Sequence, residues 1–301
     1  MVYTLTLNPS LDYMMPVRQL RIGATNRSEG EQIRIGGKGI NVSILLRSLG
    51  VENLALGIAA GFTGEELLRR MNEEGICHDF LMGGEGFTRI NVKLLSEEET
   101  EINGSGPVIG EAEAQALLRQ LEEIHSEDYL VISGSAPRGI PEDFLDRLLG
   151  KAIQQGAEIV LDISGPALRR ALRYHPFLIK PNQRELEEIL SVSIPDRKQA
   201  LLHGKKLQEL GARNVLISLG AEGAVLLDEK GGVYSKKAPD GLLVSSVGAG
   251  DSMVAGFLAG WIQSHAYDQA FCMGLAAGSA SAFSWDIAKP EDVLRLYQTL
   301  I

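Results

Sequence analysis

The sequence has only two cysteines, no long hydrophobic run and no surplus of positive charge. Cys77 and Cys272 stand far apart in the chain, which excludes a disulfide framework and a cysteine metal cluster. No apolar run approaches the roughly 18 residues that span a membrane, and the first five residues lack the basic segment of an export signal. These absences predict reduced cysteines in a cytoplasmic protein.

The net charge of −10 argues against a nucleic-acid partner, because phosphate backbones are bound by basic surfaces. The 301 residues suffice for one large domain with an accessory piece. A hydrophobic content of 45% and a mean hydropathy near zero fit a globular protein. If the substrates are phosphorylated, basic residues must gather locally against the overall charge.

Strand-like and helix-like segments alternate along most of the chain. We expect strands at 2–7, 54–60, 129–133, 158–163, 177–180 and 214–218, and helices at 40–49, 64–74, 112–124, 142–154, 184–190, 199–210 and 252–262. The strands are apolar without alternation, which indicates a mostly parallel sheet covered by helices on both faces. The expected fold is therefore α/β, with a single domain over residues 1–301.

Two segments, 12–35 and 86–104, break this rhythm. Their polar and apolar residues alternate as in exposed antiparallel strands. We expect them to form a small β-sheet that projects from the main domain as a candidate lid.

The most informative string is VGAGDS at 247–252, where a small-residue turn leads into a helix. The N–H groups of Gly248, Ala249 and Gly250 would point outward there and bind an anion together with the helix dipole. Asp251 lies directly in this anion site. A carboxylate makes sense there if it takes a proton from a hydroxyl that attacks phosphorus. Alternatively, Asp251 only caps the helix.

Two further strings follow or precede expected elements near the ligand edge of the sheet. NPSLD at 8–12 places Asp12 after the first strand, where a carboxylate suits sugar hydroxyls; the alternative is a plain Asx turn. GGKGIN at 36–41 puts glycines around Lys38 at a helix start, either as an anion cradle or as a flexible loop with a solvated lysine. No Ser or Thr follows the Gly-Lys pair and no complete G-x-G-x-x-G occurs, so neither a Walker A loop nor a nicotinamide fingerprint is present.

In the string TRINVK at 88–93, the strand period of two puts Arg89, Asn91 and Lys93 on one face. A guanidinium and an ammonium group on one face suit a phosphate dianion, although the same pattern fits a solvated strand face.

The string KPNQRE at 180–185 ends a strand and starts a helix. Glu185 in it fits either a water-mediated Mg²⁺ contact or a capping box with Asn182. SLGAEG at 218–223 is a glycine turn at a strand end that would let a nucleotide approach closely, but many hairpins look the same.

As an ordered set, these strings resemble the ribokinase-like sugar kinases, and within them the phosphofructokinase-B group of hexose-phosphate kinases. The resemblance runs from residue 5 to about residue 280. TRINVKL at 88–94 and EINGSGP at 101–107 are similar to the branch that phosphorylates fructose 1-phosphate. The tagatose-6-phosphate branch shares the opening, the GGKG turn and the GAGD-like turn but usually differs after Thr-Arg. Ala136 and Arg138 are conservative departures.

The resemblance implies a role for each candidate residue. Asp251 resembles the catalytic base, and Gly248, Ala249 and Gly250 resemble the anion hole for the transferring phosphoryl group. Asn182 and Glu185 match an element associated with Mg²⁺ and phosphate. The expected nucleotide positions are Ser218, Gly220 and Gly223, and the expected sugar-phosphate contacts are Asp12, Gly37, Lys38, Asn41, Arg89 and Asn103. Lys38 and Arg89 would grip the phosphate already on the sugar, with Lys93 as a further candidate.

The implied activity is ATP- and Mg²⁺-dependent phosphorylation of fructose 1-phosphate on O6. Tagatose 6-phosphate and fructose 6-phosphate are alternative acceptors. A sugar-phosphate sensor that lost catalysis is a different reading, against which the intact Asp251 argues, since a sensor needs no base. The resemblance also implies a homodimer formed through the lid.

Overall fold

A nine-stranded sheet forms the centre of the molecule in the computed structural model, which describes residues 1–97 and 100–301. The strand order is β13-β12-β11-β10-β9-β8-β1-β4-β5. The strands are β1 (Val2–Thr6), β4 (Asn53–Ala59), β5 (His78–Met82), β8 (Tyr129–Ser133), β9 (Glu158–Asp162), β10 (Leu178–Ile179), β11 (Asn214–Ser218), β12 (Ala224–Leu227) and β13 (Val233–Lys236). All neighbours pair in parallel except β11–β12 and β12–β13. The expectation of a mostly parallel sheet is confirmed.

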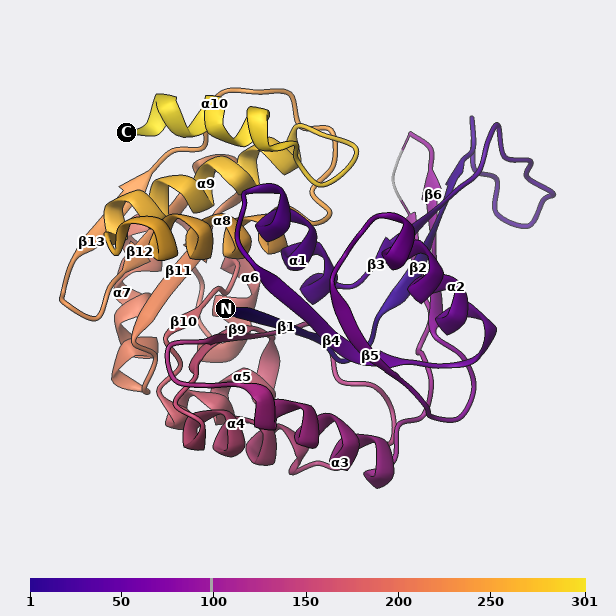
Figure 1. The fold of residues 1–301 in the computed structure, drawn as a ribbon. Helices are drawn as coiled ribbons and strands as arrows, with labels where there is room; N and C mark the ends of the chain where they lie inside the picture. Colours follow the sequence, from indigo (N-terminus) through magenta and orange to yellow (C-terminus); the bar gives the residue numbers. More distant parts are fainter. Residues whose placement is uncertain (98–99) are drawn as a thin grey trace.

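Helices cover both faces of this large sheet (Figure 1). One layer contains α1 (Lys38–Ser48), α8 (Ala249–Ser264), α9 (Tyr267–Ala282) and α10 (Pro290–Leu300). The opposite layer contains α3 (Glu111–Gln120), α4 (Phe144–Gln154), α5 (Gly165–Ala171), α6 (Gln183–Leu190) and α7 (Arg197–Glu209). Each layer shares an apolar core with one face of the sheet, which explains why the central strands are buried without alternation.

Helices α8 and α9 approach each other closely because small residues face across their contact. A Cβ atom on Gly256 of α8 would lie 2.5 Å from the Cβ of Ala277 on α9. Interiors packed this tightly tolerate no added methyl group without a shift of backbone. The contact therefore fixes the direction of α8, and with it the position of its first turn.

A second, small sheet has the order β3-β2-β6-β7. It consists of β3 (Gln32–Gly36), β2 (Ser10–Pro16), β6 (Arg89–Leu95) and β7 (Thr100–Asn103), and it projects beside α2 (Gly61–Glu73) in Figure 1. Leu11 and Ile35 pack with Leu67 and Met71 of α2, while the other face of the sheet is polar. The expected small sheet is confirmed, although residues 98 and 99 of the segment 86–104 lie outside the described residues.

The pairing within the small sheet differs from the antiparallel expectation at its centre. The outer pairs β2–β3 and β6–β7 are antiparallel, but β2 and β6 run parallel. Parallel neighbours need a long crossover connection, and here β4 and α2 lie between β2 and β6 in the chain. Alternation along one strand cannot reveal this direction, because it reports only which residues share a face.

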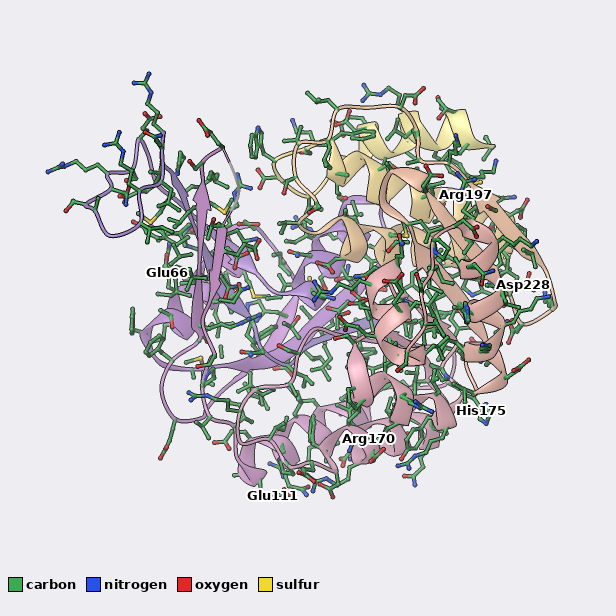
Figure 2. All side chains as sticks on the ribbon, turned by 180° about the vertical axis from the view of Figure 1, so that it is seen from behind. Glu66, Glu111, Arg170, His175, Arg197 and Asp228 are labelled. Carbon is green, nitrogen blue, oxygen red and sulfur yellow. The ribbon has the colours of Figure 1, made fainter. Side chains whose placement is uncertain are left out.

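Several elements were not expected from the sequence: β5, β12, β13, α5, α9 and α10. The hairpin β12–β13 depends on Asp228, whose Oδ1 accepts hydrogen bonds from the N–H groups of Lys230 (2.8 Å) and Gly232 (2.7 Å). Figure 2 shows Asp228 toward the rim of the molecule, at this edge of the sheet. Among the described residues, no helix is both long and apolar enough to cross a membrane.

Candidate active site

A cavity of about 950 Å³ lies where the carboxyl ends of the large-sheet strands face the polar side of the small sheet. Nearly all residues expected at the site line it: Asp12, Gly37, Lys38, Asn41, Arg89, Asn182, Glu185, Ser218, Gly220, Gly223, Gly248, Ala249, Gly250 and Asp251. The exception is Asn103, which is exposed on β7 opposite Asn91 and does not line the cavity. The fold therefore gathers residues from both ends of the chain at one edge of the sheet, where α/β proteins bind ligands.

Helix α8 starts on this cavity, and the left-handed backbone of its N-cap favours glycine. Gly248 is the N-cap with a left-handed φ of 75°, and a Cβ atom there would lie 2.8 Å from Ile287. First-turn N–H groups have no acceptor within their own helix, so they can bind an anion. Among the described residues, no side chain makes a capping hydrogen bond to this helix. Asp251 is thus not a cap, and the alternative reading of that residue is wrong.

Asp251 is 5% exposed, and its Oδ2 accepts a hydrogen bond of 2.7 Å from Asn41 Nδ2. Burial raises the pKa of Asp251 to about 6, and the negative charge of Asp162 adds to this effect. The hydrogen bond from Asn41 and the charges of Lys38 and Lys180 act in the opposite direction. The carboxyl group is therefore ionised at neutral pH but holds a proton better than an exposed aspartate, as a general base requires.

The same pKa predicts a stability gain for Asp251→Asn. Ionised Asp251 destabilises the fold by up to about 3 kcal/mol above pH 6, because its folded-state pKa lies above the unfolded value of about 4. We expect the variant to need more urea to unfold at pH 7.5, and this advantage to vanish as the pH falls below about 4, where the wild-type carboxyl is protonated in both states. Equal midpoints at pH 7.5 would contradict the buried charge.

Two buried charged residues of the site carry no role in the sequence analysis: Asp162 and Lys180. Asp162 ends β9 and is 2% exposed; one of its oxygens lies 3.3 Å from Lys38 Nζ and the other 3.3 Å from Lys180 Nζ. Burial alone would raise the pKa of Asp162, but the two lysines outweigh burial and lower it. Asp162 and Lys180 each stand at the end of an apolar strand, and this sequence signal could have identified them as site residues.

The wall formed by the small sheet is a hydrogen-bonded network around Asp12. Its Oδ1 accepts from Ser10 Oγ (2.8 Å) and from Asn91 Nδ2 (2.9 Å), and its Oδ2 lies 3.5 Å from Lys93 Nζ. Lys93 is buried against Asp12 and Glu101 and does not line the cavity. Asp12 is therefore held in a fixed orientation.

Arg89 is the basic residue of this wall. Its Nε donates to the carbonyl oxygen of Asn8 (3.1 Å), which anchors one edge of the guanidinium group. Burial lowers the pKa of Arg89, but an arginine stays charged in any protein environment. Arg89 lines the cavity, whereas Lys93 does not.

Asn182 and Glu185 form a capping box at the start of α6. The N–H of Glu185 donates to Asn182 Oδ1 (2.8 Å), and the N–H of Asn182 donates to Glu185 Oε2 (2.9 Å). Glu185 also lines the cavity, so the cap leaves room for a ligand contact. No group of three or more His, Cys, Asp or Glu among the described residues could hold a metal. Mg²⁺ at Glu185 would therefore take most of its oxygen ligands from phosphates and water, which fits its usual coordination.

Opposite the small sheet, the turn after β11 forms the remaining wall. Ser218 ends β11, and Gly220 begins a short 3₁₀ turn (Gly220–Glu222) before Gly223. Ala238, which lies against Gly223, also lines the cavity, as do Gly241 and Phe283, which lie against each other. Small residues and one aromatic ring suit a flat heterocycle.

The side chains of the cavity carry no surplus of positive charge. Four basic residues, Lys38, Arg89, Lys180 and Arg184, face five acidic ones, Asp12, Asp162, Glu185, Asp240 and Asp251. A phosphorylated ligand would therefore depend on the N–H groups of α8, on a divalent cation and on Arg89.

Comparisons with known proteins agree over nearly all of the chain. The family model for pfkB family carbohydrate kinases matches residues 5–288. A 1-phosphofructokinase of Bacillus subtilis (strain 168) is 44% identical over 98% of this chain and 97% of that protein. A D-tagatose-1-phosphate kinase of Bacillus licheniformis is 38% identical over 99% and 97%. The structure of phosphofructokinase-2 from Escherichia coli in complex with fructose-6-phosphate is similar with a TM-score of 0.93, at 31% identity over 99% and 98% of the two chains.

Proposed function

Because the chain belongs to the PfkB family of carbohydrate kinases, we propose that it transfers the γ-phosphoryl group of ATP to O6 of fructose 1-phosphate. The product would be fructose 1,6-bisphosphate. The observation that carries the proposal is the buried Asp251, which lies in the first turn of α8 and accepts its hydrogen bond from Asn41 rather than from the helix backbone.

In the proposed reaction, the carboxylate of Asp251 takes the proton from the O6 hydroxyl. O6 bonds to the γ-phosphorus while the bond from that phosphorus to the bridging oxygen breaks, and ADP leaves. The N–H groups of Gly250 and its neighbours at the start of α8 stabilise the negative charge on the transferring oxygens. Lys38 reaches the same region, because its ammonium group lies 3.3 Å from Asp162.

The sugar would lie against the small sheet, with Asp12 accepting from its hydroxyl groups and Arg89 holding the phosphate on C1. ATP would lie along Ser218, Gly220 and Gly223, near Asn182. Bound Mg²⁺ would neutralise charge on the nucleotide phosphates. Closure of the small sheet over the sugar would exclude water, which otherwise competes as acceptor. Asn103, on the exposed edge of that sheet, would reach the sugar only in such a closed state.

A panel of sugar phosphates with coupled detection of ADP tests the proposal. Fructose 1-phosphate is expected to give the highest kcat/KM. Tagatose 1-phosphate is the second candidate, because a relative of 38% identity is named for it. Preference for a 6-phosphate would contradict the substrate, and ADP release that no sugar phosphate stimulates would favour a binding protein without catalysis.

The charge of Glu185 can be tested without loss of its cap, because glutamine also completes a capping box. We expect Glu185→Gln to raise the Mg²⁺ concentration that gives half-maximal rate, since one negative charge near a hard cation is lost. Mg²⁺ titrations of wild type and variant at saturating ATP measure this. An unchanged titration in a variant of wild-type stability would limit Glu185 to the cap.

We further propose that the protein works as a homodimer in the cytoplasm, where ATP is made. The small sheet is the proposed interface, because its edge strand β7 is open and Ile102 on it is 60% exposed. Sedimentation of wild type and Ile102→Lys tests this, with dissociation of the variant as the expected result.

A further inference from the structure

Lys180 occupies a place that is unfavourable for a cation. It is 4% exposed, and a Cβ atom built on Gly250 would lie 3.0 Å from its Nζ. The ammonium group therefore lies against the first turn of α8, at Gly250, the residue that precedes Asp251. The N-terminal end of a helix carries partial positive charge and repels cations. Burial of an ammonium group also costs free energy unless the group is paired.

The partner that compensates Lys180 is Asp162, at 3.3 Å. Asp162 ends β9 and Lys180 follows β10, and these strands are parallel neighbours, so their carboxyl ends meet at the cavity floor. Lys38 pairs with the other oxygen of Asp162, but its side chain is 41% exposed and lies at the first position of α1. Lys38 can thus turn toward a ligand, whereas Lys180 is fixed.

We propose that Lys180 is a positioning residue of the phosphoryl-transfer site, which holds Asp162 beside Asp251 and balances its charge so that Asp251 stays ionised yet able to accept a proton. The inference rests on the proposed role of Asp251 as the base. Lys180 itself acts through the two carboxylates.

The other groups that face Asp251 do not balance charge there as the pair of Lys180 and Asp162 does. Helix α1 contributes Asn41, which donates a neutral hydrogen bond, and Lys38, whose side chain is partly exposed. Helix α9 contributes Gly278 and Ser279 to this part of the cavity, neither of which titrates. Glu185 of α6 acts on Lys38. Asp162 raises the pKa of Asp251 and Lys180 lowers it, in keeping with the geometry.

Two substitutions should therefore shift the acid limb of the pH–kcat/KM profile in opposite directions. Wild type should lose activity as the pH falls through about 6. Lys180→Met should move this limb to higher pH, and Asp162→Asn should move it to lower pH, each by about one pH unit. The double variant should return close to the wild-type position, and Lys180→Arg should keep it. Lys151→Met, which breaks a surface pair with Glu122, is the matched control and should shift nothing.

The titration of Asp251 can also be followed without any substrate, as the infrared absorption of its protonated carboxyl group in the difference from Asp251→Asn. Opposite shifts in this titration would support the inference even if the kinase assay failed, which separates it from the proposed function. Shifts in the same direction, or a lower kcat with an unmoved titration, would overturn it and make Lys180 purely structural. If Lys180→Met does not fold, the direction of the Asp162→Asn shift decides.

Discussion

Asp251→Asn is expected to lower kcat by roughly 10²–10⁴-fold, the usual loss when a general base is removed. Asparagine has nearly the same shape as aspartate and its carbonyl oxygen can still accept the hydrogen bond from Asn41. The affinities for ATP and for the sugar phosphate should therefore change little. Steady-state rates together with calorimetric binding of each ligand measure the two effects separately.

Asp240→Asn is the matched control for this change, because Asp240 lines the same cavity but is exposed, whereas Asp251 is buried. It should keep turnover within a few-fold of wild type. If Asp251→Asn retained more than about a tenth of the wild-type turnover, the catalytic role of Asp251 would be refuted. The expected stability gain of the same variant adds a second, independent measure, since a residue selected for catalysis is often unfavourable for folding.

Arg89→Ala is expected to raise KM for the sugar phosphate by about 10- to 150-fold and to leave KM for ATP nearly unchanged. Hydrogen bonds to charged groups contribute roughly 1.5–3 kcal/mol, and this range corresponds to that factor. Arg89 lies on β6, away from the turn after β11 where the nucleotide is proposed to bind. The variant should also lose most of its preference for fructose 1-phosphate over fructose, because the discriminating contact is gone.

Arg184→Ala provides the comparison, since Arg184 also lines the cavity but belongs to α6 on the other side. Its loss should leave KM for the sugar phosphate within about twofold, because no charge-assisted contact to the sugar is removed. Equal effects of Arg89→Ala on ATP and on the sugar would instead show that Arg89 supports the small sheet through Asn8 rather than binding phosphate.

Elements with local signals in the sequence were predicted correctly. The strands Tyr129–Ser133 and Asn214–Ser218 have the expected bounds, and the helices that follow glycine turns lie within a few residues of their predicted positions. Apolar runs and helical spacing report burial and period directly. The motifs at the strand ends also located the cavity, because the carboxyl edge of a parallel sheet is where such folds bind ligands. Helices α9 and α10 were not predicted from the sequence, and neither was the parallel direction of β2 and β6.

The chemistry within that cavity depends on contacts between residues that are distant in the chain. Asn41 and Asp251 are 210 residues apart in the chain, yet they share a hydrogen bond of 2.7 Å. Lys93 shares a strand face with Arg89, but pairing with Asp12 and Glu101 removes it from the cavity. Burial and ion pairing depend on which distant segments meet, and they fix the pKa of Asp251 and the pairing of Lys180 with Asp162. The physical reason is that charge interactions and desolvation follow distance in space, which local sequence patterns do not encode.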